Sequence, residues 1–260
     1  MTGWLIYDRV SIIRNQGFAD MLTEYAKKTG IELILKFDDD IIFNPLPDFV
    51  IMRSYNFSIS ARFEELGVRV FNNSNVSEIC NDKYKTYKYF INKNIPMMET
   101  KLFEDKIKLP FRFPFVVKPV DGHGGKGVTL ISNDDEFNSF KIEGKMIAQK
   151  FASNKGKDLR VYIMGNKILK GMLRVSETDF RSNFSLGGKA YIHELTAKEK
   201  AVIDKVLSYM SFDFAGIDLI YHKGNPVLNE IEDVVGSRML YSYTDIDAGK
   251  EYIDYIKNEL

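Results

Sequence analysis

Residues Phe115–Ile131, with the sequence FVVKPVDGHGGKGVTLI, decide how the rest of the chain is interpreted. Two apolar, β-branched runs flank a loop with four glycines, and Gly122–Gly127 fits the pattern G-x-G-x-x-G. A dinucleotide-binding fingerprint needs a helix directly after this loop. Val128–Ile131 is instead typical of a second strand. The stretch therefore predicts a β-hairpin with a glycine-rich tip.

Such a tip is suited to binding an anion. Glycines let backbone N–H groups approach a phosphate closely, and Lys118 on the incoming strand is placed to reach the same group. The alternative is a mobile hairpin tip that binds nothing. A protein-kinase loop is disfavoured, because Lys118 precedes the glycines and the chain has no H-R-D or D-F-G motif.

Length and composition indicate one large domain or two to three small lobes of a soluble protein. The chain has 260 residues, of which 45% are hydrophobic and 28% charged. Lys+Arg and Asp+Glu both number 36, which argues against a nucleic-acid partner. No signal peptide or membrane span is evident. Cys80 is the only cysteine, so no intrachain disulfide can form, and a cytoplasmic location is expected.

The first 75 residues alternate between short apolar runs and helical patterns, which predicts a small parallel α/β lobe. In such sheets, ligands bind beyond the carboxyl ends of the strands. Arg9, Arg53 and the Asn72-Asn73-Ser74 segment are expected to gather at that edge. The alternative is that Asn73 or Ser74 caps the next helix and that the arginines are solvated.

The C-terminal half is predicted to be mostly antiparallel. Leu159–Met164 and Lys167–Val175 flank a Gly-Asn pair that suits a tight turn. Ser153–Lys157 is expected to be a polar break before these strands. Thr196, followed by Glu199 three residues later, predicts a capping box at the start of a helix.

An acidic hairpin follows. If the chain folds back about Gly224, Asp218 lies opposite Glu230, and Glu232 lies opposite Gly216, whose lack of a side chain leaves space. Like charges that face each other on a sheet are destabilising, so a positive group is needed. Hard cations such as Mg²⁺ meet this need through oxygen ligands. The alternative is a solvated acidic face that is neutralised by nearby arginines, namely Arg160, Arg174 or Arg181.

In order along the chain, the segments VVKP, the glycine-rich hairpin, DLR, DFRSN, FAGIDLI and VLNEIE resemble the ATP-grasp superfamily. Within it, they are most similar to the RimK-like glutamate ligase group. The resemblance implies an α/β chain, α+β in its ATP-binding part, with an ATP-grasp fold. Residues 1–75 would form a Rossmann-like N-terminal lobe, residues 76–152 a central lobe with the glycine-rich lid, and residues 153–260 a C-terminal lobe with the metal site.

For the nucleotide, the resemblance implies two ATP-contacting lysines, a flexible phosphate lid, a hinge that holds adenine through backbone groups, and an acid near the ribose. In that order, the matching residues are Lys83 and Lys118; Gly122, His123, Gly124, Gly125, Lys126 and Gly127; Gln149, Lys150 and Phe151; and Asp158. For His123, a phosphate contact and simple exposure are both open.

For the chemical step, the resemblance implies basic residues near substrate or phosphate, a pair near the transferred phosphoryl group, and metal-binding acids. The matching residues are Arg160 and Arg174; Arg181 and Asn183; and Asp218 and Glu230, with Glu232 as a third acid. This chain departs from the family in having Glu232 where asparagine is usual and Lys150 where an acid is usual. The segment after the metal strand, 233–238, also differs, so the substrate cannot be carried over.

The sequence therefore predicts an ATP- and Mg²⁺-dependent carboxylate–amine ligase that forms an amide or peptide bond through an acylphosphate. One or two Mg²⁺ ions are expected, with Mn²⁺ as a substitute. An amino acid such as glutamate, a peptide or a protein terminus is the expected substrate, and Arg9, Arg53 and Arg238 are candidates to bind its carboxylates. A homo-oligomer is allowed. The alternatives are a nucleotide-binding module without turnover and an ATP-dependent kinase.

Overall fold

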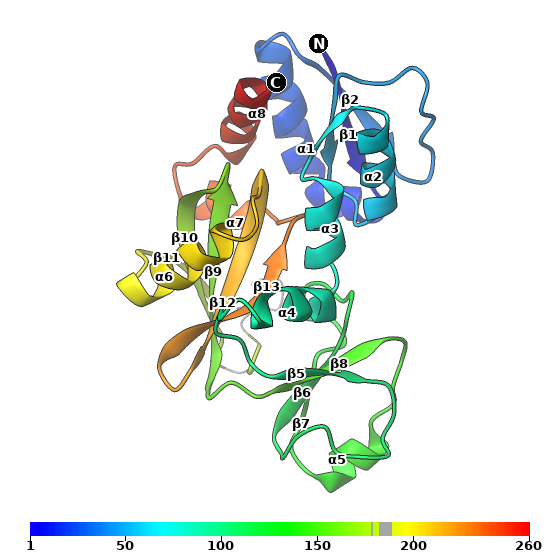
Figure 1. Ribbon diagram of the computed structural model, residues 1–260. Coiled ribbons are helices and arrows are strands. Elements are labelled where there is room, and N and C mark those ends of the chain that lie inside the picture. Colours follow the sequence, from blue (N-terminus) through cyan, green and yellow to red (C-terminus); the bar gives the residue numbers. More distant parts are fainter. Residues whose placement is uncertain (178, 182–188) are drawn as a thin grey trace.

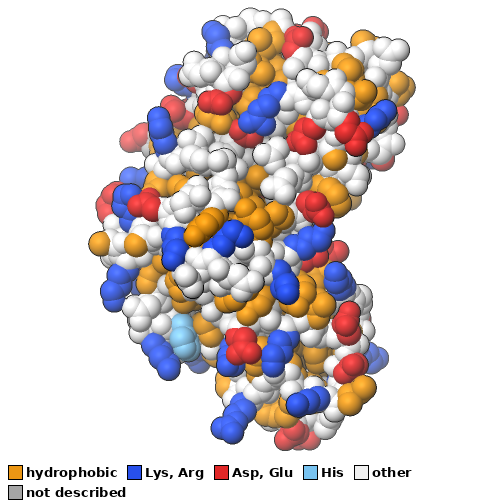
Figure 2. Space-filling view, viewed as in Figure 1, with side chains coloured by type: hydrophobic (Ala, Val, Ile, Leu, Met, Phe, Trp, Pro, Cys, Tyr) orange, Lys and Arg blue, Asp and Glu red, His pale blue; other side chains and the backbone are white. Residues whose placement is uncertain are grey.

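The computed structural model describes residues 1–177, 179–181 and 189–260. The strands in this part of the chain form three sheets. The sheet from residues 2–71 lies at one end of the molecule and the sheet from residues 100–150 at the other, with a five-stranded sheet between them (Figure 1). On the face shown in Figure 2, acidic and basic side chains are intermixed rather than gathered by sign.

The N-terminal sheet is parallel, as predicted. Its strand order is β2-β1-β3-β4, with bounds β1 (Thr2–Tyr7), β2 (Glu32–Phe37), β3 (Phe49–Met52) and β4 (Arg69–Phe71). The helices α1 (Ser11–Lys28) and α2 (Phe57–Glu65) complete this lobe. Helix α3 (Ser74–Cys80) follows, and the Asn73 side chain accepts a hydrogen bond from the Val76 N–H at its start. Asn73 is therefore a helix cap, the alternative left open by the sequence.

The central sheet contains the predicted glycine-rich hairpin. Its strands, in the order β5-β8-β6-β7, are β5 (Thr100–Phe103), β8 (Met146–Lys150), β6 (Phe115–Pro119) and β7 (Thr129–Ile131). Phe115 pairs with Ile131 and Val117 with Thr129, which confirms the hairpin. Helix α4 (Lys83–Ile91) precedes this sheet, and α5 (Asp134–Ser139) follows β7 and packs on the sheet through Phe137.

The five-stranded sheet is antiparallel, as predicted. Its order β11-β10-β9-β12-β13 is made by β11 (Lys189–His193), β10 (Lys167–Val175), β9 (Asn154–Met164), β12 (Phe214–His222) and β13 (Asn225–Glu232). The predicted break at Ser153–Lys157 is wrong from Asn154 onward. Gly156, with φ +68°, lies within β9, and a Cβ there would lie 2.4 Å from the Ser176 carbonyl oxygen. The strand can therefore continue only because this residue is glycine.

The helices after the sheet are α6 (Ala197–Leu207), α7 (Arg238–Tyr243) and α8 (Ala248–Glu259). The predicted capping box of Thr196 and Glu199 is present at the start of α6. Helix α8 returns to the N-terminal lobe, where it lies beside α1 (Figure 1). No helix among the described residues is long and apolar enough to cross a membrane.

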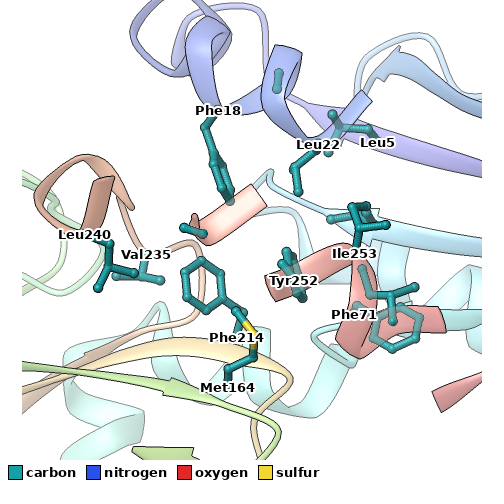
Figure 3. Packing of buried hydrophobic residues seen from close by; sticks show 14 of the residues in the cluster. Leu5, Phe18, Leu22, Phe71, Met164, Phe214, Val235, Leu240, Tyr252 and Ile253 are labelled. Carbon is teal, nitrogen blue, oxygen red and sulfur yellow. The ribbon is translucent and has the colours of Figure 1, made fainter. Parts of the chain in front are cut away.

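One core joins the N-terminal sheet to the five-stranded sheet. Phe18 and Leu22 of α1, Phe214 of β12, and Tyr252 and Ile253 of α8 belong to the same buried cluster (Figure 3). The central sheet has its own core around Phe103, Phe115 and Phe137 (the Phe115 side chain is fully buried). Two sheets are therefore fixed to each other, and the glycine-rich hairpin belongs to the third.

Candidate functional site

A cleft lies between the central sheet and the five-stranded sheet. Its empty space, including the opening to solvent, is about 890 Å³, which is within the range of small-molecule sites. Most of the predicted nucleotide and metal residues line it: Lys83, Lys118, Gly122, His123, Gly124, Gly125, Gln149, Lys150, Phe151, Asp158, Arg181, Glu230 and Glu232. Lys126, Gly127, Arg160, Arg174 and Asp218 are not part of this lining.

The glycine-rich tip, residues 121–128, forms one wall of the cleft. Gly124, Gly125 and Gly127 have positive φ angles of 64°, 76° and 69°, a conformation that other residues adopt only with strain. The Lys83 ammonium donates a hydrogen bond to the Gly122 carbonyl oxygen. Arg181 Nη1 donates to the Gly125 carbonyl oxygen at 3.0 Å. The tip is therefore held against groups from both sides of the cleft.

Lys118 reaches into the cleft from strand β6. Its side chain is 6% exposed, and its ammonium donates to Asn229 Oδ1 at 3.2 Å. Burial lowers the pKa of Lys118 to about 8, although the nearby Glu230 carboxylate raises it. A bound anion would raise this pKa again and stabilise the charged ammonium, which favours phosphate as a ligand of the cleft.

The end of β8 supplies a mixed polar and apolar wall. Gln149 is buried, and its Nε2 donates to Thr100 Oγ1 at 3.0 Å. The Lys150 ammonium, at the position where the family usually has an acid, pairs with Glu99 at 2.5 Å. Because Lys150 is engaged by Glu99, a planar base here would be held mainly by backbone groups and by apolar surface. That surface comes from Val116, Val128, Phe151, Ala152, Phe180 and Ile220.

The acidic hairpin β12–β13 has the predicted side-chain pairs, although its turn is not centred on Gly224 as expected. Asp218 pairs with Glu230 and Gly216 with Glu232. The turn is centred between Lys223 and Gly224, because His222 pairs with Asn225. A β-bulge at Asn229 then shifts the register by one residue between Leu219 and Asp218. The shift of the turn and the extra residue of the bulge cancel each other. The predicted pairs that involve the carboxylates are therefore correct.

Behind the acidic hairpin lies a buried ionic network. Asp218 is 1% exposed and accepts hydrogen bonds from Arg160 Nε at 2.8 Å, Arg160 Nη2 at 2.7 Å and Arg174 Nη2 at 2.7 Å. Burial raises the pKa of Asp218, but the two guanidinium groups outweigh this effect and hold it below its usual range. Arg174 also pairs with Asp158, and Arg160 with Glu232.

The three acids fit a divalent cation. One carboxylate oxygen from each of Asp218, Glu230 and Glu232 lies within 4.8 Å of the others, and oxygen donors are those that Mg²⁺ prefers. Glu230 and Glu232 face the cleft; Glu232 also pairs with Arg160, and Asp218 is engaged by both arginines. Lys83 Nζ lies 3.6 Å from Glu230 Oε2. Both alternatives from the sequence are thus present: a metal-compatible cluster, and arginine neutralisation of its buried member.

The basic residues considered for substrate carboxylates lie in different surroundings. Arg9 pairs with Asp39 on the surface. Arg53 is 2% exposed; its Nη2 donates to the Val235 carbonyl oxygen at 2.6 Å, and its guanidinium lies 5.4 Å from the centre of the Phe18 ring. Both are engaged within the protein, and Arg238 is exposed. Arg181 pairs with Asp179, and Asn183 lies outside the described residues.

Sequence reasoning missed several lining residues. Val116 lies two residues before Lys118 and Ile220 two residues after Asp218, so strand periodicity alone could have placed both on the cleft side. Asn229, the partner of Lys118, is exposed to the cleft by the bulge, which no pattern in the sequence signals. Phe180, whose ring centroid is 6.0 Å from that of Phe151, lies within the DFRSN motif, but the motif does not indicate that its ring lines the cleft.

The two α+β lobes that enclose this cleft, joined to a parallel N-terminal lobe, define the ATP-grasp fold. Residues 80–256 match the RimK-like ATP-grasp domain model. The chain belongs to this family, and it is an ATP-dependent ligase of the ATP-grasp type. Members of the family bind ATP together with a divalent metal ion.

Relatives and solved structures agree with this assignment. The uncharacterized protein MG011 homolog of Mycoplasma pneumoniae is 31% identical, with 91% of this chain and 85% of the relative covered. A probable alpha-L-glutamate ligase of Maridesulfovibrio salexigens is 30% identical, with coverages of 78% and 72%. The D-alanine–D-alanine ligase of Bacillus anthracis, solved with ATP, matches with a TM-score of 0.77 at 20% identity, covering 99% of this chain and 96% of that one. This last likeness shows the shared fold.

Proposed function

We propose that the chain joins the carboxyl group of one substrate to the amine of another, at the expense of ATP, through an acylphosphate. The observation that carries this proposal is the opposition, across one cleft, of a lysine-lined glycine tip and a cluster of carboxylates. Lys83 and Lys118 would bind the phosphates of ATP, with the backbone N–H groups of residues 122–125. Glu230 and Glu232 would hold Mg²⁺, or Mn²⁺ in its place.

The chemistry needs charge neutralisation and positioning more than a special nucleophile. The donor carboxylate attacks the γ-phosphorus and ADP leaves; the amine then attacks the acyl carbon, and phosphate and a proton are released. Arg181 would stabilise the negative charge on the transferred phosphoryl group, and its place in the cleft lining and its contact with the tip support this role. Arg160 and Arg174 lie behind the acids, where their charges hold Asp218 and Glu232 in place. The bound metal would neutralise phosphate charge.

We propose an amino acid as one substrate, with glutamate first. Two relatives are named probable alpha-L-glutamate ligase and glutamate–LysW ligase, and this supports glutamate, free or at the end of a peptide or protein. Arg9 and Arg53 are engaged within the protein, so Arg238, exposed at the start of α7, is the remaining candidate of the three for a substrate carboxylate. A cytoplasmic enzyme is in keeping with these substrates.

The test is ADP and phosphate release with mixtures of amino acids and short peptides, in the presence of Mg²⁺. We expect amino-acid-stimulated release by the unaltered protein and at least a tenfold loss in Glu230→Gln, because an outward-facing ligand is removed. Glu194→Gln is the matched control, since the Glu194 side chain is 90% exposed. ATP binding without stimulated turnover would favour a binding module, and a stable phosphate ester on the acceptor would favour a kinase.

A further inference from the structure

The glycine tip touches the N-terminal lobe through one pair of rings. The imidazole of His123 stacks on the phenol of Tyr55, with centroids 3.9 Å apart and ring planes 12° from parallel. The two residues are 68 positions apart in the sequence. Tyr55 follows β3 of the N-terminal sheet, and His123 lies between β6 and β7 of the central sheet. His123 is part of the cleft lining, so the stack lies at its edge.

The side chains of Lys83, Arg181 and Tyr55 contact the tip in the position seen here. Lys83 and Arg181 also have a role in the proposed reaction. Lys83 donates to the Gly122 carbonyl oxygen, and Arg181 to that of Gly125. Both cations are expected to bind phosphate when ATP is present, which would draw their donors away from those carbonyl oxygens. The stack on Tyr55 uses neither cation. It can therefore persist over bound ATP.

Tyr55 is a fixed support for this contact. Two residues before Tyr55, Arg53 donates through its backbone N–H to the Ile6 carbonyl oxygen at 2.7 Å and through its side chain to the Val235 carbonyl oxygen. Ser54 Oγ donates to Asp38. The N-terminal lobe that carries Tyr55 also shares its core with the five-stranded sheet. A mobile tip that docks on Tyr55 is thus docked on the rigid part of the molecule that bears the acids.

We propose that Tyr55 is a positioning residue that latches the glycine tip closed by stacking on His123. This inference rests on the proposed function for its purpose: an acylphosphate hydrolyses in water, and a closed tip excludes water from it. His123 then serves as the tip's docking ring and not as a phosphate ligand.

Hydrogen exchange of the tip measures the latch without any turnover. We expect amides of residues 121–128 to exchange faster by roughly two- to tenfold in Tyr55→Ala, as expected for the loss of an aromatic pair. Tyr55→Phe and His123→Phe keep a ring in each position and should retain protection. Tyr241→Ala removes a similarly exposed tyrosine on α7 (39% against 36% for Tyr55) and should leave the tip unchanged.

These variants distinguish the Tyr55–His123 contact from a general loosening of the lobe and from a phosphate contact of His123. Tyr55→Ala and His123→Ala combined should have no more effect than either alone, because each breaks the same contact. Unchanged tip exchange in Tyr55→Ala overturns the proposal. Faster exchange also in the core strand β12 would show that the lobe had loosened generally, and would overturn it as well. If His123→Phe weakens ATP binding while Tyr55→Ala does not, His123 is a phosphate ligand and the latch is wrong.

Kinetics then test the purpose of the latch. With ATP and the substrates identified by turnover assays, Tyr55→Ala should release several ADP for each amide bond formed, whereas Tyr55→Phe should keep the ratio near one. Altered exchange with an unaltered ratio would mean that the contact exists but does not protect the intermediate, which overturns the purpose assigned to it. If the ligase activity itself is absent, the exchange result still decides whether the contact holds the tip.

Discussion

Lys118 is the residue in which the electrostatics of the cleft are clearest. It is buried, its pKa is lowered, and its ammonium donates a hydrogen bond to Asn229. An ammonium in such surroundings gains much from an incoming phosphate, because the anion replaces the hydration that burial removed. Its environment is therefore that of a ligand-binding lysine and differs from that of a solvated one.

We predict that Lys118→Met weakens ATP binding by roughly 10- to 100-fold, the range expected when a buried charge-assisted hydrogen bond is lost. Isothermal titration with a non-hydrolysable ATP analogue measures this. Lys126→Met is the matched comparison, since Lys126 belongs to the same loop but lies outside the cleft lining. We expect less than a threefold effect there, and equal losses in the two variants would mean that the tip closes differently over ATP.

At the residue scale, the sequence predicts which types of group meet but not which of them are free to bind a ligand. Lys118, the glycines of the tip and the acids of the hairpin are indicated by their places in the strand and turn patterns, whereas Lys83 is indicated only by the resemblance to the family. Arg53 shows the limit: its position at the end of a parallel strand is that of a ligand-binding residue, yet its guanidinium bonds to Val235 across the lobes. Only the tertiary structure reveals such a partner.

Among the elements, helix α6 begins with a polar cluster that has no part in the cleft. Glu199 completes the capping box with Thr196, and it also accepts hydrogen bonds from the Tyr221 hydroxyl at 2.6 Å and lies 2.8 Å from His193 Nε2. Burial raises the pKa of Glu199, but these hydrogen bonds outweigh it, and the pKa is lowered from its ordinary 4.5. The ionised carboxylate therefore ties β11, α6 and β12 together.

We predict that Glu199→Gln destabilises the protein by about 1–3 kcal/mol at pH 7, because a charged acceptor of several bonds is lost. A carboxylate with a lowered folded pKa stabilises the fold above its unfolded pKa, and this stabilisation disappears as the pH falls through the folded value. The difference between the two proteins should thus be full above about pH 4.5 and should shrink below it. Urea unfolding from pH 3.5 to 7.5 measures this, and a constant difference would contradict it.

The hairpins show how far the sequence predicts an element. Alternation and turn residues located both the glycine-rich hairpin and the acidic one, because these signals act over a few residues. These signals did not predict the bulge at Asn229, because an extra residue in one strand leaves no local pattern in the sequence. The strand β9 likewise continues through Gly156 because the returning chain at Ser176 passes close to it, a contact made only in the folded protein.

For the whole molecule, the joint between the N-terminal sheet and the five-stranded sheet matters most. Local patterns predicted a separate N-terminal lobe, but they could not predict that α8, the last helix, packs on α1, because an apolar helix face does not identify its partner. Asn72 shows how closely the two sheets are joined. Its Oδ1 accepts from the N–H groups of Asp213 and Phe214, and its Nδ2 donates to the carbonyl oxygens of Phe214 and Asp233.

We predict that Asn72→Ala destabilises the protein by roughly 2–4 kcal/mol, because several buried backbone groups lose a partner at once. Trp4, the only tryptophan, is 7% exposed in the N-terminal sheet, so its fluorescence reports that sheet, while far-UV circular dichroism reports the whole chain. Asn138→Ala, at an exposed position of α5, should change stability by less than about 0.5 kcal/mol.

If the two sheets form one cooperative unit, urea unfolding followed by Trp4 should coincide with the main transition of the whole chain. In Asn72→Ala both signals should move together to lower urea. A variant in which Trp4 reports an earlier transition, while the remaining ellipticity unfolds at the original midpoint, would show that the N-terminal lobe is independent. Tyr55 would then sit on a movable support, and the tip that docks on it would be held less firmly over the acids.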